Sequence, residues 1–348
     1  MKKIFFRIDA GKIFGLGHLS RCLCLANEFS NGFELVFFIK TDTRKVISQF
    51  IEDKLQAVIP RSLCFFELDI QPTQELKVLI DEVKRHNAFL IIDHYTADEE
   101  YQRKLYENNV KWLQFDSHAK VKLYSDMVLH GSPNATEKLY SPLIIKNTKM
   151  LVGPKYAIVG EQFKKEREKI EFRKSVKEIF ISFGGGNDKG ALLKCISDLD
   201  PSILNNISLN IVTSELNPLI NEIKEWVSKS KNVNLFINTN KVFEIMARCD
   251  LAILTPGTLS YEASCMGLPM ILISTADNQD INASGWERIG AGKYLGKIED
   301  LDKSIFNASI RNFVENKDLL KTMSKCSLDA VDGKGAERTA EIIKSHIV

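Results

Sequence analysis

Two short segments carry the residue types that could perform chemistry in this chain. The segment GLGHLSR (residues 15–21) follows an apolar stretch at residues 4–8 and begins a helical pattern. The segment PGTLSYEA (residues 256–263) follows an apolar stretch at residues 251–254 and also begins a helical pattern. A strand, a turn of small residues and a helix N-terminus together present free backbone N–H groups and a positive dipole end to an anion. One such unit in each half of the chain predicts a nucleotide-sugar cleft between two α/β domains, with His18 beside the sugar.

The first segment is open to two interpretations. A Gly-x-Gly turn can serve only a tight backbone, with His18 capping the helix. It can equally bind a ligand, because such turns lie at the edge of an α/β sheet where ligands bind. A dinucleotide cofactor is disfavoured, because the third glycine of that fingerprint is missing and the next strand runs from Ile39 into Lys40 instead of an acidic residue.

The second segment is the stronger motif. The backbone N–H groups of Gly257 and Thr258 could bind a diphosphate, and Glu262, one helical turn further on, could accept both hydroxyls of a ribose. The alternative is a capping box, in which Thr258 caps the helix and a glutamate three residues later closes the box. Tyr261 stands at that position. The spacing therefore favours the ligand interpretation.

Polar residues also follow three other apolar stretches. These segments are DHY (residues 93–95), DSH (residues 116–118) and GGGND (residues 184–188). A single histidine in such a loop is more often solvated than catalytic. Because the carboxyl ends of parallel strands meet at one edge of a sheet, we expect the first two segments to form a polar wall with His18. The glycines of the third would let the backbone approach a ligand closely.

Apolar stretches alternate with helical patterns along the whole chain, including a short apolar stretch at Ala57–Ile59. Strands that are apolar throughout and alternate with helices are typical of a parallel sheet covered on both faces. The plan repeats after a charged stretch at residues 161–177. The sequence therefore predicts an α/β protein with two doubly wound, Rossmann-like domains, at residues 1–160 and 161–348, and an interdomain cleft.

Composition narrows the classes of partner. The 348 residues carry a net charge of +2 from 47 basic and 45 acidic side chains, so no nucleic-acid partner is expected. No apolar run reaches the length of a membrane span, and the apolar N-terminal run is broken at Arg7 and Asp9, which argues against a signal peptide. The seven cysteines are an odd number without metal-ligand spacing, which predicts reduced thiols in a cytoplasmic protein and no metal site.

In their order along the chain, these motifs resemble the UDP-sugar hydrolases of pseudaminic acid biosynthesis, the PseG family with its spore-coat SpsG relatives. That family has the GT-B fold of the MurG enzyme. The matching segments are RID (7–9), GLGHLSR (15–21), DHY (93–95), FDS (115–117), GPKYA (153–157), GGND (185–188), GTLSYEA (257–263) and NQ (278–279). Two positions depart from the family pattern: Gly160 stands where an arginine is usual, and Ser117 where a second aspartate is usual.

The resemblance implies a role for each matching residue. His18 would be the catalytic base of the first domain, and the second domain would bind UDP. The substrate-binding residues would be Gly17, Arg21, Tyr95, Gly185, Gly186, Gly257, Thr258, Leu259, Glu262 and Asn278, with Tyr95 and Asn278 facing the sugar.

The reaction implied is metal-independent, inverting hydrolysis of UDP-2,4-diacetamido-2,4,6-trideoxy-β-L-altrose, without a cofactor. The free sugar would pass to a nonulosonic acid synthase, in a pathway that serves flagellin glycosylation or surface polysaccharide. The protein is expected to be a cytoplasmic monomer. Two alternatives remain: a GT-B glycosyltransferase that uses a UDP-sugar donor, and a non-catalytic protein that binds a nucleotide sugar.

Overall fold

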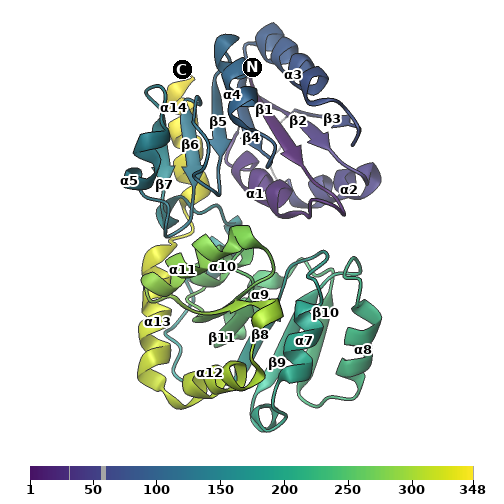
Figure 1. The fold of residues 1–348 in the computed structure, drawn as a ribbon, viewed down its shortest axis with the longest axis vertical. Helices are drawn as coiled ribbons and strands as arrows, with labels where there is room; N and C mark the ends of the chain where they lie inside the picture. Colours follow the sequence, from purple (N-terminus) through teal and green to yellow (C-terminus); the bar gives the residue numbers. More distant parts are fainter. Residues whose placement is uncertain (31, 56–59, 348) are drawn as a thin grey trace. The chain divides into compact units, whose positions relative to one another are not determined.

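The protein consists of two compact units, described here from a computed structural model (Figure 1). The structure describes residues 1–30, 32–55 and 60–347, and of Asn278 it describes the backbone. The first unit comprises Met1–Ile158 and Lys334–Val348, and the second comprises Val159–Gly333.

The first unit contains a seven-stranded parallel sheet in the order β3-β2-β1-β4-β5-β6-β7. The strand order reverses between β1 and β4, which is the topological switch point where ligands of open α/β sheets bind. Its strands are β1 (Lys2–Asp9), β2 (Phe33–Lys40), β3 (Arg61–Phe66), β4 (Phe89–Asp93), β5 (Trp112–Phe115), β6 (Met127–His130) and β7 (Lys149–Val152). Its helices are α1 (Gly17–Ala26), α2 (Arg44–Lys54), α3 (Pro72–His86), α4 (Glu99–Glu107), α5 (Glu137–Tyr140) and α14 (Gly335–His346).

The second unit repeats this plan with a six-stranded parallel sheet in the order β10-β9-β8-β11-β12-β13. Its strands are β8 (Glu178–Ser182), β9 (Ser208–Thr213), β10 (Val233–Ile237), β11 (Leu251–Leu254), β12 (Met270–Ser274) and β13 (Gly292–Lys297). Its helices are α6 (Glu161–Arg167), α7 (Ala191–Asp198), α8 (Ile220–Ser228), α9 (Val242–Arg248), α10 (Thr258–Cys265), α11 (Asp280–Arg288), α12 (Lys303–Glu315) and α13 (Lys317–Ala330). Two doubly wound parallel sheets, as predicted from the apolar strands, are thereby confirmed.

The differences from the sequence prediction lie mainly at the sheet edges. β3 and β13, which the apolar pattern did not indicate, are edge strands with most residues partly exposed. Polar residues and glycines are common in edge strands, because one side of the strand faces solvent. The strand predicted at Ala57–Ile59 lies outside the described residues. The charged stretch predicted to link the domains contains helix α6.

The sequence prediction assigned the C-terminal helix α14 to the second domain, but the structure places it in the first unit. Its residues Ala336, Ala340 and Ile343 are buried in the core of the first unit, and α14 packs against α1. The side chain of Lys344 also donates a hydrogen bond to the carbonyl oxygen of Glu28, at 2.7 Å. An apolar stripe predicts a helix that covers a sheet, but it does not say which of two sheets the helix covers.

Shortening a buried side chain of α14 should destabilise the first unit alone. The side chain of Ile343 is fully buried, so Ile343→Ala leaves a cavity in the core. The substitution should lower the free energy of unfolding of the first unit by about 2–5 kcal/mol. Hydrogen exchange followed by mass spectrometry should show faster exchange in β1, β2 and α1, with β8 and β11 unchanged. Ile305→Ala on α12, where the side chain is exposed, is the matched control. Equal loss of protection in both units would contradict the assignment of α14.

Candidate functional site

The polar residues of the first unit converge on a single carboxylate at the switch point. Asp93 is the last residue of β4, a strand in which every residue is buried, and its side chain is 1% exposed. His18 lies in the first turn of α1, the helix that follows β1. Its Nδ1 atom is 2.6 Å from Oδ1 of Asp93. The N-cap residue of α1 is Leu16, so the interpretation of His18 as a helix cap is wrong.

The protonation of this pair follows from its surroundings. Burial alone would raise the pKa of Asp93, but the charges and hydrogen bonds of Arg21 and His18 outweigh burial and hold it well below its ordinary value. A carboxylate can only accept hydrogen bonds, so Nδ1 of His18 carries the proton that it donates to Asp93. In the tautomer with its proton on Nδ1, the lone pair of the imidazole is on Nε2, which is the arrangement of a general base oriented by a carboxylate.

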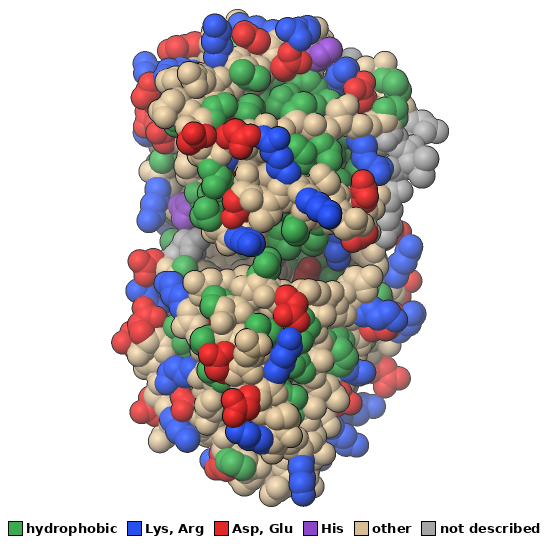
Figure 2. Space-filling view, turned by 90° about the vertical axis from the view of Figure 1, so that its right-hand side faces the viewer, with side chains coloured by type: hydrophobic (Ala, Val, Ile, Leu, Met, Phe, Trp, Pro, Cys, Tyr) green, Lys and Arg blue, Asp and Glu red, His purple; other side chains and the backbone are tan. Residues whose placement is uncertain are grey.

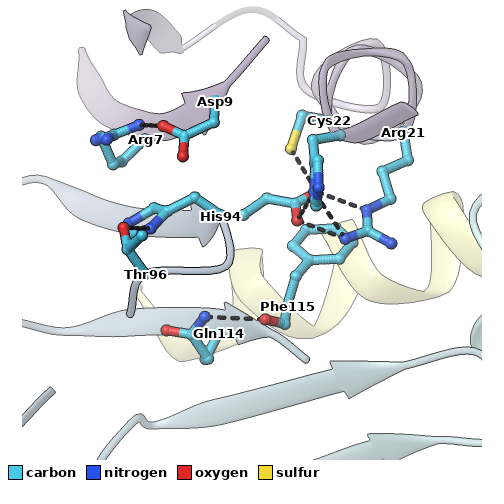
Figure 3. Close-up of polar contacts among 10 residues, drawn as sticks. Arg7, Asp9, Arg21, Cys22, His94, Thr96, Gln114 and Phe115 are labelled. Atoms are coloured by element: carbon cyan, nitrogen blue, oxygen red, sulfur yellow. Dashed lines mark hydrogen bonds and ion pairs between the residues drawn. The ribbon is translucent and has the colours of Figure 1, made fainter. Parts of the chain in front are cut away.

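Two further side chains of α1 bind the same carboxylate. Arg21 donates from Nε to Oδ2 and from Nη2 to Oδ1 of Asp93, each at 2.5 Å, and its guanidinium lies over the ring of Phe115, 4.8 Å from the centroid. The thiol of Cys22 donates to Oδ2 of Asp93 at 3.5 Å. Figure 3 shows Arg21 and Cys22 reaching from α1 toward this point, with Phe115 beneath Arg21. Arg21, predicted to bind substrate, is thus engaged in holding Asp93.

The opposite side of this close-up contains a separate buried ion pair (Figure 3). Arg7 is fully buried and donates to both carboxylate oxygens of Glu75, at 2.7 and 2.8 Å, and to Asp9 at 2.6 Å. Two acidic groups therefore share one buried guanidinium. The first motif of the sequence, RID, contributes to the structure of the sheet in this unit.

His18 and Asp93 form one wall of a pocket of about 180 Å³ in the first unit. The ring of Tyr95 stands edge-on to that of His18, with centroids 4.6 Å apart, and is 57% exposed. His118 lies near the same tyrosine, with centroids 5.7 Å apart. The predicted polar wall of His18, Tyr95 and His118 is therefore one continuous group of rings. Other side chains lining the pocket come from β5 and from the loops after β4 and β5, and include His94, Gln114, Asp116, Ser117, Lys120 and Leu123.

In the second unit, the start of α10 is fixed by side chains of α11. Ser260 donates to the carbonyl oxygen of Gly257 at 2.6 Å. Asn282 donates to the carbonyl oxygen of Pro256 at 2.6 Å, and the indole of Trp286 donates to Ser260 at 2.9 Å. Neither Asn282 nor Trp286 belongs to a motif, so the sequence did not indicate them. These hydrogen bonds fix the turn before α10.

The remaining predicted residues of this unit lie at the same edge of its sheet. Gly257, not Thr258, is the N-cap residue of α10, so the capping-box interpretation is wrong. Gly185 and Gly186 follow β8, the parallel neighbour of β11, and the carbonyl of Gly185 accepts a hydrogen bond from Ser214 at 2.7 Å. Thr258, Leu259 and Glu262 lie in the first turn and a half of α10. The side chain of Asn278 lies outside the described residues.

Within the described ranges, no three His, Cys, Asp or Glu side chains are grouped as ligands of a metal ion. No helix in that part of the chain is both long and apolar enough to cross a membrane.

The ion pair at Asp93 should make stability depend on pH in a definite direction. Because the folded-state pKa lies below the ordinary value of about 3.9, the carboxylate stabilises the protein fully above that value, and its contribution is lost as the pH falls toward the lowered pKa. Asp93→Asn should therefore cost about 3–5 kcal/mol at pH 7 and clearly less at pH 3.

Scanning calorimetry of both proteins at the two pH values measures this difference. Asp53→Asn, at an exposed position on α2, is the matched control and should be nearly neutral at both. If Asp93→Asn lost the same amount of stability at pH 7 and at pH 3, the charge of Asp93 would not be what stabilises the site.

Comparison with known proteins relates the chain to enzymes of nucleotide-sugar metabolism. The model of the LpxB family, lipid-A-disaccharide synthetase, matches residues 191–279. The spore coat polysaccharide biosynthesis protein SpsG of Bacillus subtilis is 24% identical over 97% of this chain and 96% of its own length. The UDP-2,4-diacetamido-2,4,6-trideoxy-beta-L-altropyranose hydrolase of Campylobacter jejuni is 29% identical over 81% of this chain and 95% of its own length.

Among solved structures, MurG of Acinetobacter baumannii matches with a TM-score of 0.67 at 16% identity, and the match covers 99% of this chain and 100% of that one. At that identity the match shows the fold alone, which is of the GT-B type predicted. Together with the two relatives, it confirms what the motifs indicated: the chain resembles the PseG and SpsG proteins along most of its length and has their GT-B fold.

Proposed function

We propose that this protein hydrolyses a UDP-linked 2,4-diacetamido-2,4,6-trideoxyhexose, releasing UDP and the free sugar without a metal ion. The observation that carries the proposal is the His18–Asp93 pair, at 2.6 Å, on the wall of a pocket. The substrate class is the one named for the Campylobacter relative. The free sugar would then be available to a nonulosonic acid synthase.

The proposed reaction is a single displacement at the anomeric carbon. Water attacks that carbon, the bond to the diphosphate oxygen breaks, and UDP leaves with the bonding electrons. His18 accepts the proton of the water at Nε2, and the carboxylate of Asp93 stabilises the imidazolium that forms. Attack opposite the leaving group inverts the configuration of the carbon. Arg21 keeps Asp93 ionised and fixed, so that the base is oriented before substrate binds.

The second unit would supply the nucleotide site. The backbone N–H groups at Gly257, Thr258 and Leu259 would bind the diphosphate, and the charge that develops on the leaving group would be stabilised there. Glu262 would accept the ribose hydroxyls. The hydrogen bonds from Asn282 and Trp286 support this role, because they fix the turn before any ligand arrives.

A small-molecule substrate also agrees with the surface charge. On the face drawn in Figure 2, Lys and Arg side chains are interspersed with Asp and Glu over both units. A protein that binds nucleic acid usually gathers its basic residues in a patch or stripe.

The second candidate is a glycosyltransferase with a UDP-sugar donor, favoured by the match of residues 191–279 to the LpxB family. His18 would then deprotonate an acceptor hydroxyl instead of water. The deciding experiment follows UDP release from UDP-2,4-diacetamido-2,4,6-trideoxy-β-L-altropyranose in the presence of EDTA, with and without an acceptor. Release that needs no acceptor and survives EDTA supports hydrolysis. Release that requires an acceptor or added magnesium would overturn the proposal.

Replacing the base should reduce turnover without affecting the nucleotide site. General-base catalysis contributes a factor of about 10²–10⁴, so His18→Asn should lower kcat by about that factor and leave the Kd of UDP near the wild-type value. His86→Asn, at the end of α3 and outside the pocket, is the matched control and should keep full activity. Full turnover by the His18 variant would remove this residue from the mechanism.

Glu262→Ala should weaken UDP binding. Two ribose hydroxyls would lose a charged acceptor, which corresponds to about 1.5–3 kcal/mol in the free energy of binding. Calorimetric titration with UDP measures the change, and Glu222→Ala, at an exposed position on α8, serves as control. Unchanged affinity in the Glu262 variant would exclude this residue from the ribose site.

A further inference from the structure

The loop after β5 has a backbone shape that its sequence does not favour. Ala119 has a φ angle of +50°, in the left-handed region. A residue with a Cβ atom adopts this region at an energetic cost, which surrounding contacts must offset. Its neighbours in the chain, His118 and Lys120, line the pocket, so this backbone conformation determines how the pocket wall is shaped.

A chain of hydrogen bonds holds the loop in that shape. The carboxylate of Asp116 accepts the backbone N–H groups of His118, at 3.3 Å, and of Ala119, at 2.8 Å. The hydroxyl of Tyr140 donates to Asp116 at 2.5 Å. Because that hydroxyl has one proton, Nδ1 of His130, 2.6 Å away, donates to its oxygen. Tyr140 is fully buried and His130 is 6% exposed, so the bond between these two side chains is shielded from water.

The loop held in this way presents the ring of His118 to the pocket. Among the described residues, no group hydrogen-bonds to either ring nitrogen of His118, while its backbone is fixed at Asp116. Burial, aided by the charge of Lys120, lowers the pKa of His118 against the opposing charge of Asp116. At neutral pH the ring is uncharged and offers one N–H donor and one acceptor.

We propose that His118 hydrogen-bonds a neutral substituent of the sugar ring, a hydroxyl or an acetamido group, and that Tyr140, acting through Asp116, is the residue that positions it. This inference rests on the proposed function, because it places a sugar in the pocket beside His18. The two histidines have different tasks. His18 has the carboxylate that a base needs, whereas the unpaired nitrogens of His118 suit recognition.

Kinetics of the hydrolysis separate these tasks. An interaction made equally in the ground state and the transition state changes KM and leaves kcat alone. His118→Ala should raise KM about tenfold with kcat within about twofold, and His118→Gln, which keeps a donor and an acceptor, should recover part of the loss. Tyr140→Phe removes one hydroxyl and should raise KM about three- to tenfold. Tyr106→Phe, at an exposed tyrosine of α4, is the matched control.

A double-mutant cycle tests whether Tyr140 acts through His118. In the His118→Ala background, Tyr140→Phe should have no further effect on KM. Equal effects of Tyr140→Phe in both backgrounds would overturn the positioning role. So would a fall in melting temperature with KM unchanged, since that is the result of a purely structural hydrogen bond.

A binding measurement keeps this inference distinct from the proposed function. The imidazole ¹⁵N signals of His118 should shift with UDP-N-acetylglucosamine and with UDP-glucose more than with UDP, and the larger response identifies the preferred substituent. If wild-type protein hydrolyses no UDP-sugar but His118 responds in this way, the proposed function fails and the sugar contact stands. If hydrolysis occurs but neither sugar nucleotide shifts His118 more than UDP does, the sugar contact is overturned.

Discussion

The first unit depends on one buried negative charge. Asp93 is 1% exposed, and an isolated carboxylate at such a position would take up a proton instead of remaining ionised. Arg21 supplies the compensating charge through two short hydrogen bonds, and His18 and Cys22 satisfy the remaining acceptor sites. All three come from consecutive turns of α1, where residues three and four apart lie on one face. A single carboxylate therefore ties α1 to the end of β4 and determines which nitrogen of His18 stays available.

The sheet lies between the negative charge of Asp93 and the positive charge of Arg7. In the parallel register Arg7 pairs with Ile92 and Ile8 with Asp93, so Arg7 and Asp93 project from opposite faces. Arg7 is neutralised by Glu75 and Asp9 on its own face. Each face thus has its own ion pairs, and Arg7 and Asp93 share no hydrogen-bond partner.

Sequence reasoning found the groups that lie next to a turn and missed those that act from a distance. His18, Tyr95 and the start of α10 follow apolar strands, where the strand–turn–helix pattern marks them. Asp93, the partner of His18, was visible in the sequence only as a polar residue at the end of a strand. The two residues are 75 positions apart, and nothing in the spacing joins them. His130 ends an apolar strand and Tyr140 ends a short helix, so both are typical of core positions in the sequence. The placement of α14 depends on where the chain returns, which a helical stripe does not encode.

The volume of the pocket beside His18 bears on whether water or an acceptor substrate can reach the Nε2 atom of this residue. The pocket of the first unit measures about 180 Å³. Sites for drug-sized ligands usually span about 300–1,000 Å³. A single sugar ring with a water at Nε2 suits the smaller volume better than a sugar together with an acceptor substrate. The same histidine and carboxylate could activate either nucleophile, so the proposed choice of water over an acceptor depends on what the pocket admits beside the sugar.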